Sequence, residues 1–137
     1  MNPIKFVTVG FDGSPEAREA LRWAASLCAS LGASLKVVHA VGLLEEAHHV
    51  ATAAFSEEEI HNLASEAGLA PDRVEWCMEE GAPADVLLRV TADPHNVELL
   101  VVGSRGAGRT AGTVLGSTSL EVAERATVPV AIVPHAH

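Results

Sequence analysis

The sequence predicts a three-layer α/β domain, in which helices cover both faces of an open, twisted, parallel β-sheet of five strands. Short apolar, β-branched segments alternate with helical segments along the chain, and strands separated by helices pair in parallel through right-handed crossovers. The residues are 48% hydrophobic but only 4% aromatic, as expected for a sheet that is covered by helices of small residues. The chain contains no repeat or linker, so residues 1–137 should form a single domain.

The first part of the chain contains two expected strands with a long helix between them. Ile4 to Gly10 is apolar and β-branched, as in a strand that is buried on both faces. Ser14 is a suitable N-cap and Pro15 suits the first helical position, so we expect a helix from Pro15 to about Leu31. Leu35 to Val41 is the second expected strand.

The alternation continues after Gly42 to Phe55, a segment in which no element is clear. Ser56 and Glu59 have the spacing of a capping box, at the start of a helix that should end near Gly68. Another helix should begin at residues 82–85 and end before Pro94. The other expected elements are strands at Val74–Glu79, Val97–Val102 and Val128–Val133, and a last helix from Ser117 to Ala126.

The segment between the fourth expected strand and the last helix has the composition of an anion site. Residues 103–119 contain five glycines, two arginines and no acidic residue, although the whole chain has a formal net charge of −9. Glycine lets backbone N–H groups approach a ligand closely, and the first turn of a helix leaves N–H donors unpaired. Phosphate is the usual occupant of such a loop. Because ligands of these sheets bind at the carboxyl ends of the strands, Gly10 to Asp12 should lie beside Gly103.

The spacing of the glycines excludes two common phosphate loops and resembles a third. The chain has no Gly-x-x-x-x-Gly-Lys-Ser/Thr, and the glycines after Gly106 do not fit the dinucleotide pattern. Two residues separate Gly103 from Gly106, and nine more precede Gly116 and Ser117. This pattern resembles the nucleotide-binding motif of the universal stress protein family, in its ATP-binding branch. The resemblance extends from Val7 to Val133 and implies a Rossmann-like fold of the adenine-nucleotide-binding type, with strand order 3-2-1-4-5.

Two strand ends should contact the nucleoside. Asp12 directly follows the first strand, where its carboxylate can accept a hydrogen bond from a ribose hydroxyl or an adenine amino group; the alternative is a role in the turn or as a helix cap. The resemblance places this aspartate near the nucleotide. It also implies that the backbone of Ala40 binds the adenine edge, whereas the preceding His39 is expected to be packed and hydrogen-bonded.

The phosphates should be bound by the glycine-rich segment. Gly103 and Ser104 would line the ribose and the α-phosphate, and Gly106 would permit close approach of the loop. Ser117 would supply donors to the phosphates and also serve as the N-cap of the last helix. Arg105 either pairs with a β- or γ-phosphate or faces solvent. The full set of expected binding residues is Gly10, Asp12, Ala40, Val102, Gly103, Ser104, Arg105, Gly106, Gly116, Ser117 and Thr118.

Composition and motifs argue against several other classes of protein. The acidic net charge disfavours a general nucleic-acid or anionic-membrane binder, and no run of 18 apolar residues or signal-peptide pattern is present. Cys28 and Cys77 lie far apart without metal-ligand spacing, as in reduced thiols of a cytoplasmic protein. No catalytic residue is evident, so any ATP hydrolysis should be slow, and Mg²⁺ would be held mainly by the phosphates.

The last expected strand, Val128 to Val133, is apolar on both faces and lies at the sheet edge in the implied strand order. A long apolar edge invites pairing, and the resemblance implies a homodimer through this strand. The sequence is therefore interpreted as an ATP-binding regulator or sensor of stress responses. The alternatives are a slow ATPase or autophosphorylating enzyme, a nucleotide-free dimeric module, and a protein that binds AMP or a cyclic nucleotide.

Overall fold

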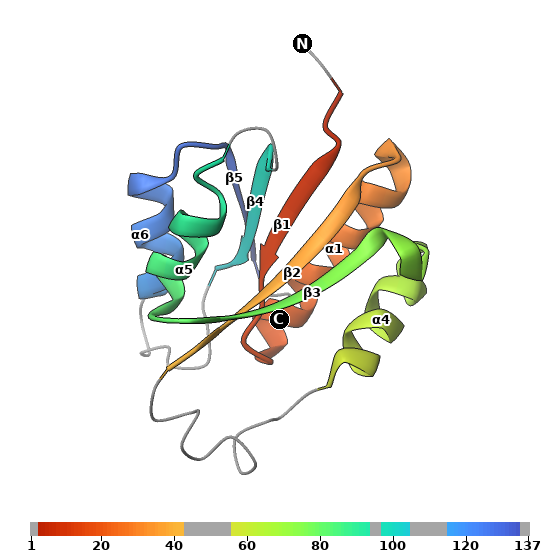
Figure 1. The fold of residues 1–137 in the computed structure, drawn as a ribbon, viewed down its shortest axis with the longest axis horizontal. Helices are drawn as coiled ribbons and strands as arrows, with labels where there is room; N and C mark the ends of the chain where they lie inside the picture. Colours follow the sequence, from red (N-terminus) through yellow and green to blue (C-terminus); the bar gives the residue numbers. More distant parts are fainter. Residues whose placement is uncertain (1–2, 43–55, 94–96, 105–114, 135–137) are drawn as a thin grey trace.

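The computed structural model describes residues 3–42, 56–93, 97–104 and 115–134. Five parallel strands form one sheet in the order β3-β2-β1-β4-β5 (Figure 1), which confirms the predicted fold class and strand order. The strands are β1 (Phe6–Gly10), β2 (Ser34–Val41), β3 (Val74–Glu80), β4 (Leu99–Gly103) and β5 (Val130–Val133). The helices are α1 (Pro15–Leu31), α4 (Glu57–Glu66), α5 (Pro83–Val90) and α6 (Ser117–Arg125), with a 3₁₀ turn, η1, at Pro71–Arg73.

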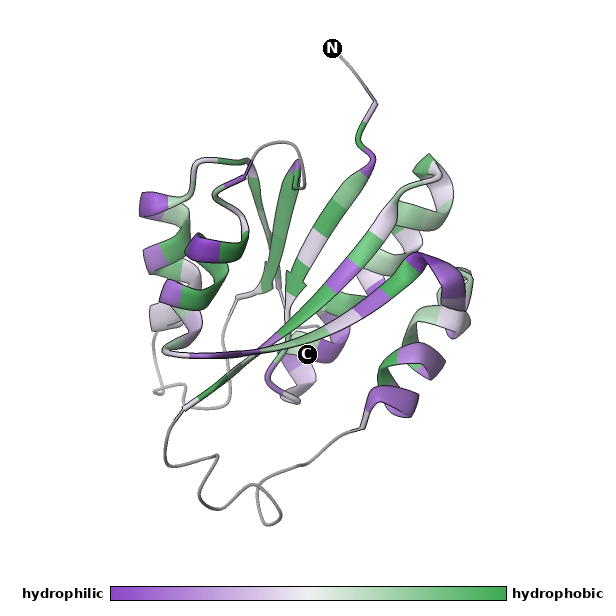
Figure 2. Ribbon diagram, viewed as in Figure 1, coloured by the Kyte–Doolittle hydropathy of each residue, from purple (hydrophilic) through white to green (hydrophobic). Residues whose placement is uncertain are grey.

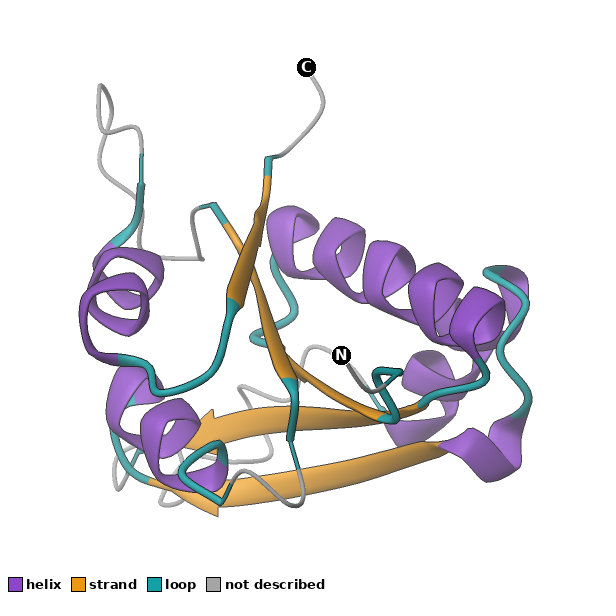
Figure 3. Cartoon of the chain, turned by 90° about the horizontal axis from the view of Figure 1, so that it is seen from above, coloured by secondary structure: helices purple, strands orange, loops and turns teal. Residues whose placement is uncertain are grey.

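The sheet separates two hydrophobic cores, one for each pair of helices. Figure 3 shows α1 and α4 on one side of the sheet and α5 and α6 on the other. Val7 and Val9 of β1 pack with α1 and α4, whereas Leu100 and Val102 of β4 pack with α5 and α6. Trp76 packs against the first core, but Trp23 is 44% exposed. Figure 2 shows the central strands β1 and β4 as largely hydrophobic, as expected for strands that are covered on both faces.

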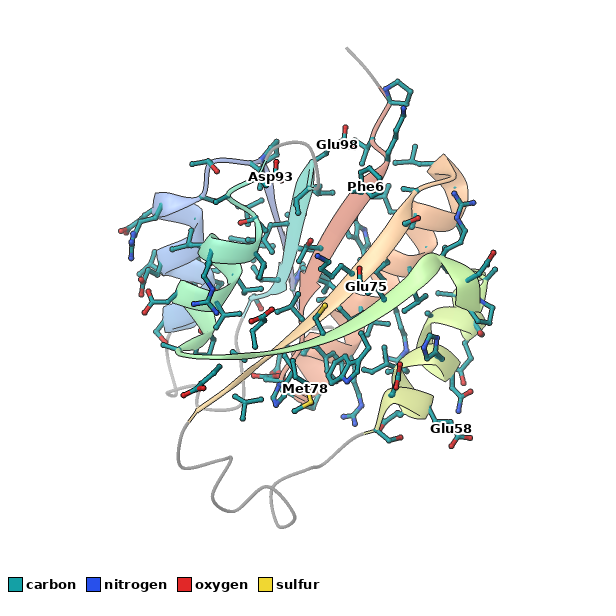
Figure 4. All side chains as sticks on the ribbon, in the orientation of Figure 1. Phe6, Glu58, Glu75, Met78, Asp93 and Glu98 are labelled. Carbon is teal, nitrogen blue, oxygen red and sulfur yellow. The ribbon has the colours of Figure 1, made fainter. Side chains whose placement is uncertain are left out.

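Strands β1, β4 and β5 each begin two residues later than their apolar sequences suggest, and side chains explain two of these shifts. The carboxylate of Glu98 accepts hydrogen bonds from the backbone N–H groups of Lys5 and Phe6, at 2.7 and 3.1 Å. Glu98 lies beside Phe6 at the amino end of β1 (Figure 4), where its side chain replaces part of the strand ladder. Before β5, Pro129 has no N–H to donate, although its carbonyl accepts from Leu100.

The register places the two loops of interest at the same edge of the sheet. Val9 pairs with Val101 between β1 and β4, and Gly10 pairs with Val38 between β1 and β2. The carboxyl ends of these three strands therefore lie side by side, as predicted. None of the described helices is long and apolar enough to cross a membrane.

Candidate functional site

The described part of the candidate site consists of four chain segments that meet at the carboxyl edge of the sheet. The turn after β1 contains Asp12, the end of β2 contains Ala40, and the end of β4 leads through Ser104 toward the start of α6. The backbone N–H of Gly116 donates to the carbonyl of Ser104 at 2.7 Å, which joins β4 to α6 directly. Two of the expected binding residues, Arg105 and Gly106, lie outside the described residues.

The glycines at the ends of β1 and β4 are sites of close packing. A Cβ atom on Gly103 would lie 2.9 Å from the backbone carbonyl oxygen of Glu16, in the first turn of α1. A Cβ atom on Gly10 would lie 2.8 Å from Cδ1 of Leu87, on α5. Gly103 is expected to line the nucleotide, but its contact with α1 is by itself a reason for glycine at this position.

The turn that contains Asp12 is held by hydrogen bonds at each of its residues. Asp12 is exposed, and its Oδ1 accepts a hydrogen bond from the backbone N–H of Ser14 at 2.9 Å. Asp12 thus has the turn role that is the alternative to a nucleotide contact. Ser14 is buried, and its Oγ accepts from the N–H of Ala17 at 3.1 Å, which confirms it as the N-cap of α1.

Two side chains hold the same turn, one from β2 and one from α1. Nδ1 of His39 lies 2.9 Å from the carbonyl oxygen of Phe11, and the His39 ring is stacked on Trp76 with centroids 6.1 Å apart. Arg18 donates to the carbonyl of Gly13 and also pairs with Glu59 on α4. His39 is thus packed and hydrogen-bonded, as expected, but no pattern in the sequence indicates that its partner lies next to Asp12.

The start of α6 differs from the expected arrangement, because Gly116 is the N-cap and Ser117 is the first helical residue. The first bond of the helix runs from the N–H of Leu120 to the carbonyl of Gly116, at 3.0 Å. The N–H groups of residues 117–119 therefore lie outside the helical ladder. The N–H of Gly116 bonds to Ser104, just beyond β4, and its carbonyl bonds to Leu120 of α6, so this residue connects the two elements.

The first turn of α6 also differs in charge from those of the other described helices. The first turns of α1, α4 and α5 each carry at least one acidic residue, but that of α6 carries none. An acidic side chain would normally stabilise this end of a helix, because the helix dipole makes it positive. The N-terminus of α6 is therefore left without the counter-charge that the other helices have.

Ser119 is a part of the site that was not predicted from the sequence. This side chain is 2% exposed, and its Oγ lies 2.9 Å from the carbonyl oxygen of Ser104 and 3.0 Å from that of Gly116. Together with the Gly116 N–H, it fastens the end of β4 to the start of α6. The only signal in the sequence is that Ser119 precedes the buried Val122 by one helical turn.

The cysteines and acidic residues do not form a metal centre in the part of the chain that is described. No three His, Cys, Asp or Glu side chains of these residues are grouped as metal ligands. Burial raises the pKa of the Cys28 thiol to about 11. Burial and the neighbouring Glu75 carboxylate also raise the pKa of Cys77. Both thiols therefore stay protonated at neutral pH, which makes them poor nucleophiles and poor metal ligands.

Residues 3–134 match the family model of the Universal stress protein family. Universal stress protein Rv1636 of Mycobacterium tuberculosis is 33% identical over 147 residues, covering 97% of this chain and 98% of the relative. The solved structure of that protein has a TM-score of 0.62. A solved universal stress protein in complex with cAMP is 30% identical, has a TM-score of 0.77 and covers 98% of this chain and 100% of its own.

Other relatives are longer than this chain. Universal stress protein Rv2624c of Mycobacterium tuberculosis is 31% identical over 134 residues, which cover 94% of this chain but 48% of the relative. The chain thus spans about half the length of the first curated relatives that it matches.

Proposed function

The chain belongs to the universal stress protein family, and we propose that it is a cytoplasmic, ATP-binding regulator or sensor of stress responses. The nucleotide would bind where the carboxyl ends of β1, β2 and β4 meet the start of α6. The observation that carries this proposal is the first turn of α6, whose N–H groups at residues 117–119 lie outside the helical ladder and whose side chains include no acid. Such a turn favours a phosphate group.

The described residues suggest a separate role for each strand end. Asp12 would accept a hydrogen bond from a ribose hydroxyl, and the backbone of Ala40 would bind the adenine edge. The end of β4 would line the ribose and the α-phosphate, through Val102, Gly103 and Ser104. Gly10 would contribute as the last residue of β1, two residues before Asp12.

The phosphate end of the ligand would be bound by Gly116, Ser117 and Thr118, together with Arg105 and Gly106. Each hydrogen bond to a charged group contributes roughly 1.5–3 kcal/mol. Four such bonds, less several kcal/mol for ordering the site, correspond to about micromolar affinity, near −8 kcal/mol. Mg²⁺ would be held mainly by the phosphates of the ligand, because no cluster of metal ligands occurs among the described residues.

A cyclic nucleotide is the second candidate ligand, and a specific finding favours it. The solved relative with a TM-score of 0.77 and 30% identity is described as a complex with cAMP. ATP and cAMP share the adenine and the ribose but differ in the number of phosphates and in the free 3′-hydroxyl. The Asp12 turn and the start of α6 would therefore contribute differently to the two ligands.

The test is to identify the bound nucleotide and to remove its phosphate site. Freshly purified protein is denatured, and the released small molecules are identified by mass spectrometry; calorimetry with ATP and with cAMP then gives the two affinities. Gly116→Val is the informative variant, because the backbone of Gly116 has a φ of −75°, which valine adopts without strain. Ala123→Val adds a similar side chain at an exposed position of the same helix and is the matched control.

We expect ATP in the wild-type protein and in Ala123→Val, and at least tenfold weaker ATP binding in Gly116→Val. Tighter binding of cAMP than of ATP would replace ATP by the cyclic nucleotide as the ligand. A wild-type protein that contains no nucleotide and binds neither ligand would overturn the proposed function.

A further inference from the structure

We propose that His39 is a positioning residue for the nucleotide site, which holds the turn after β1 so that Asp12 presents its carboxylate to the ribose. The inference rests on the proposed function, because it assigns a role to Asp12 in nucleotide binding. It goes beyond that function by naming a residue that acts on the ligand only through another residue.

Phe11, which immediately precedes Asp12, is held by β2 through both of its backbone polar groups. Phe11 lies one residue beyond the last pair of the β1–β2 ladder, Gly10 and Val38. Its backbone N–H donates to the carbonyl of Val38 at 2.9 Å. Its carbonyl lies 2.9 Å from Nδ1 of His39. Both polar backbone groups of Phe11 are therefore held by consecutive residues of β2.

The orientation of the His39 ring is itself fixed. Because a carbonyl oxygen can only accept a hydrogen bond, Nδ1 must carry the proton and donate it to Phe11. The ring is stacked on Trp76 of β3 with an interplanar angle of 11°. A rigid donor of this kind restricts the peptide plane between Phe11 and Asp12.

A side chain also holds the peptide between Gly13 and Ser14, just after Asp12. Nη1 of Arg18 donates to the carbonyl of Gly13 at 2.5 Å, and Nε and Nη2 of Arg18 both donate to Oε1 of Glu59. The carbonyls of Phe11 and Gly13, the residues on either side of Asp12, thus each accept a hydrogen bond from a side chain of a neighbouring element. A carboxylate in so constrained a turn can bind a ligand without a large ordering cost, which is the benefit of preorganisation.

The test separates positioning from a contribution to stability. His39→Leu removes the donor, whereas His39→Asn retains an N–H close to the place of Nδ1. Val37→Ala is the control for stability. Val37 is fully buried on the same face of β2, and its side chain has no donor for the Phe11 carbonyl. Affinities for ATP and for 2′,3′-dideoxy-ATP are measured by calorimetry on each variant, on Asp12→Ala and on the double variant with His39→Leu.

We expect His39→Leu to bind ATP about three- to tenfold more weakly, the effect of one hydrogen bond, and to lose the preference of the wild-type protein for ATP over the dideoxy nucleotide. His39→Asn should restore that preference, Val37→Ala should retain it, and His39→Leu should have no further effect when Asp12 is already alanine. If the wild-type protein binds ATP but His39→Leu keeps the preference, or if the two substitutions act independently, the role of His39 is overturned and the proposed function stands. If the wild-type protein binds no nucleotide, both are overturned.

Discussion

Gly103 and Gly10 are both closely packed, but the atoms around them differ. A larger side chain should therefore cost more stability at one position than at the other. A Cβ on Gly103 would meet the backbone of α1 at 2.9 Å, and a backbone atom in a helix cannot move alone. A Cβ on Gly10 would meet the end of the Leu87 side chain, which can change its rotamer. We expect Gly103→Ala to lower the free energy of unfolding by about 2–3 kcal/mol and Gly10→Ala by about 1 kcal/mol or less. Urea denaturation of both variants measures the difference, and equal losses would contradict it.

Cys28 should make the stability of the protein depend on pH. Its pKa is about 11 in the folded chain, against an ordinary value of 9.0. Above pH 9 the unfolded chain releases the thiol proton while the folded chain keeps it, so the unfolded state binds fewer protons. Stability must then fall as pH rises from about 9 toward 11, by up to about 1.4 kcal/mol per pH unit.

Thermal or urea denaturation between pH 8 and 10.5 checks this slope. The variant Cys28→Ala should be less stable at every pH, because it loses packing in the core. Its stability should nevertheless decline less steeply with pH than that of the wild-type protein. An unchanged slope in Cys28→Ala would show that another group causes the decline.

At the scale of secondary-structure elements, the first turn of α6 lacks a stabilising negative charge, and this lack favours the binding of a phosphate. Its first turn has no acidic residue, so the chain forgoes the stabilisation that an acid gives at this position. Ser117→Glu should therefore stabilise the ligand-free protein by about 0.3–1 kcal/mol. The same negative charge would repel a phosphate, so nucleotide affinity should fall at least tenfold.

The neutral variant Ser117→Gln is the control for side-chain size in this experiment. It should change neither the stability nor the nucleotide affinity by as much as Ser117→Glu. Denaturation gives the first quantity and calorimetry the second. A Ser117→Glu protein that binds ATP as well as the wild-type protein would mean that the phosphates do not lie at the start of α6.

The elements show which parts of the structure were predictable from sequence. The alternation of strands and helices specified the sheet, and the family resemblance supplied the strand order. Local capping signals at Ser14 and Ser56 were correct, because those side chains bond to backbone within three residues. Ser119 and His39 were not recognised as supports of the loops, because their partners are 15 and 28 residues away. Local patterns contain no information on such contacts.

At the scale of the whole molecule, the two edges of the sheet differ in chemistry. The edge strand β3 carries Glu75, Glu79 and Glu80, and acidic side chains discourage the pairing of an edge with another strand. The opposite edge, β5, reads Val-Ala-Ile-Val, and all four residues are half-buried. This asymmetry favours association through β5 only, and we therefore propose the homodimer that the family resemblance implies.

The backbone of β5 allows this dimer to be tested without disturbing the sheet. Pro129 and Val133 turn their carbonyls toward β4, and alternate residues of a strand point their polar groups to opposite sides. The N–H of Ile132 therefore points to the outer edge, where a second copy would pair.

Proline is tolerated at such an edge position but cannot donate a hydrogen bond. Ile132→Pro should therefore be monomeric in light scattering while its far-UV circular dichroism is retained. Ile132→Val keeps the N–H and should remain a dimer. A wild-type protein that is already monomeric, or a dimeric Ile132→Pro variant with the native fold, would exclude association through this edge.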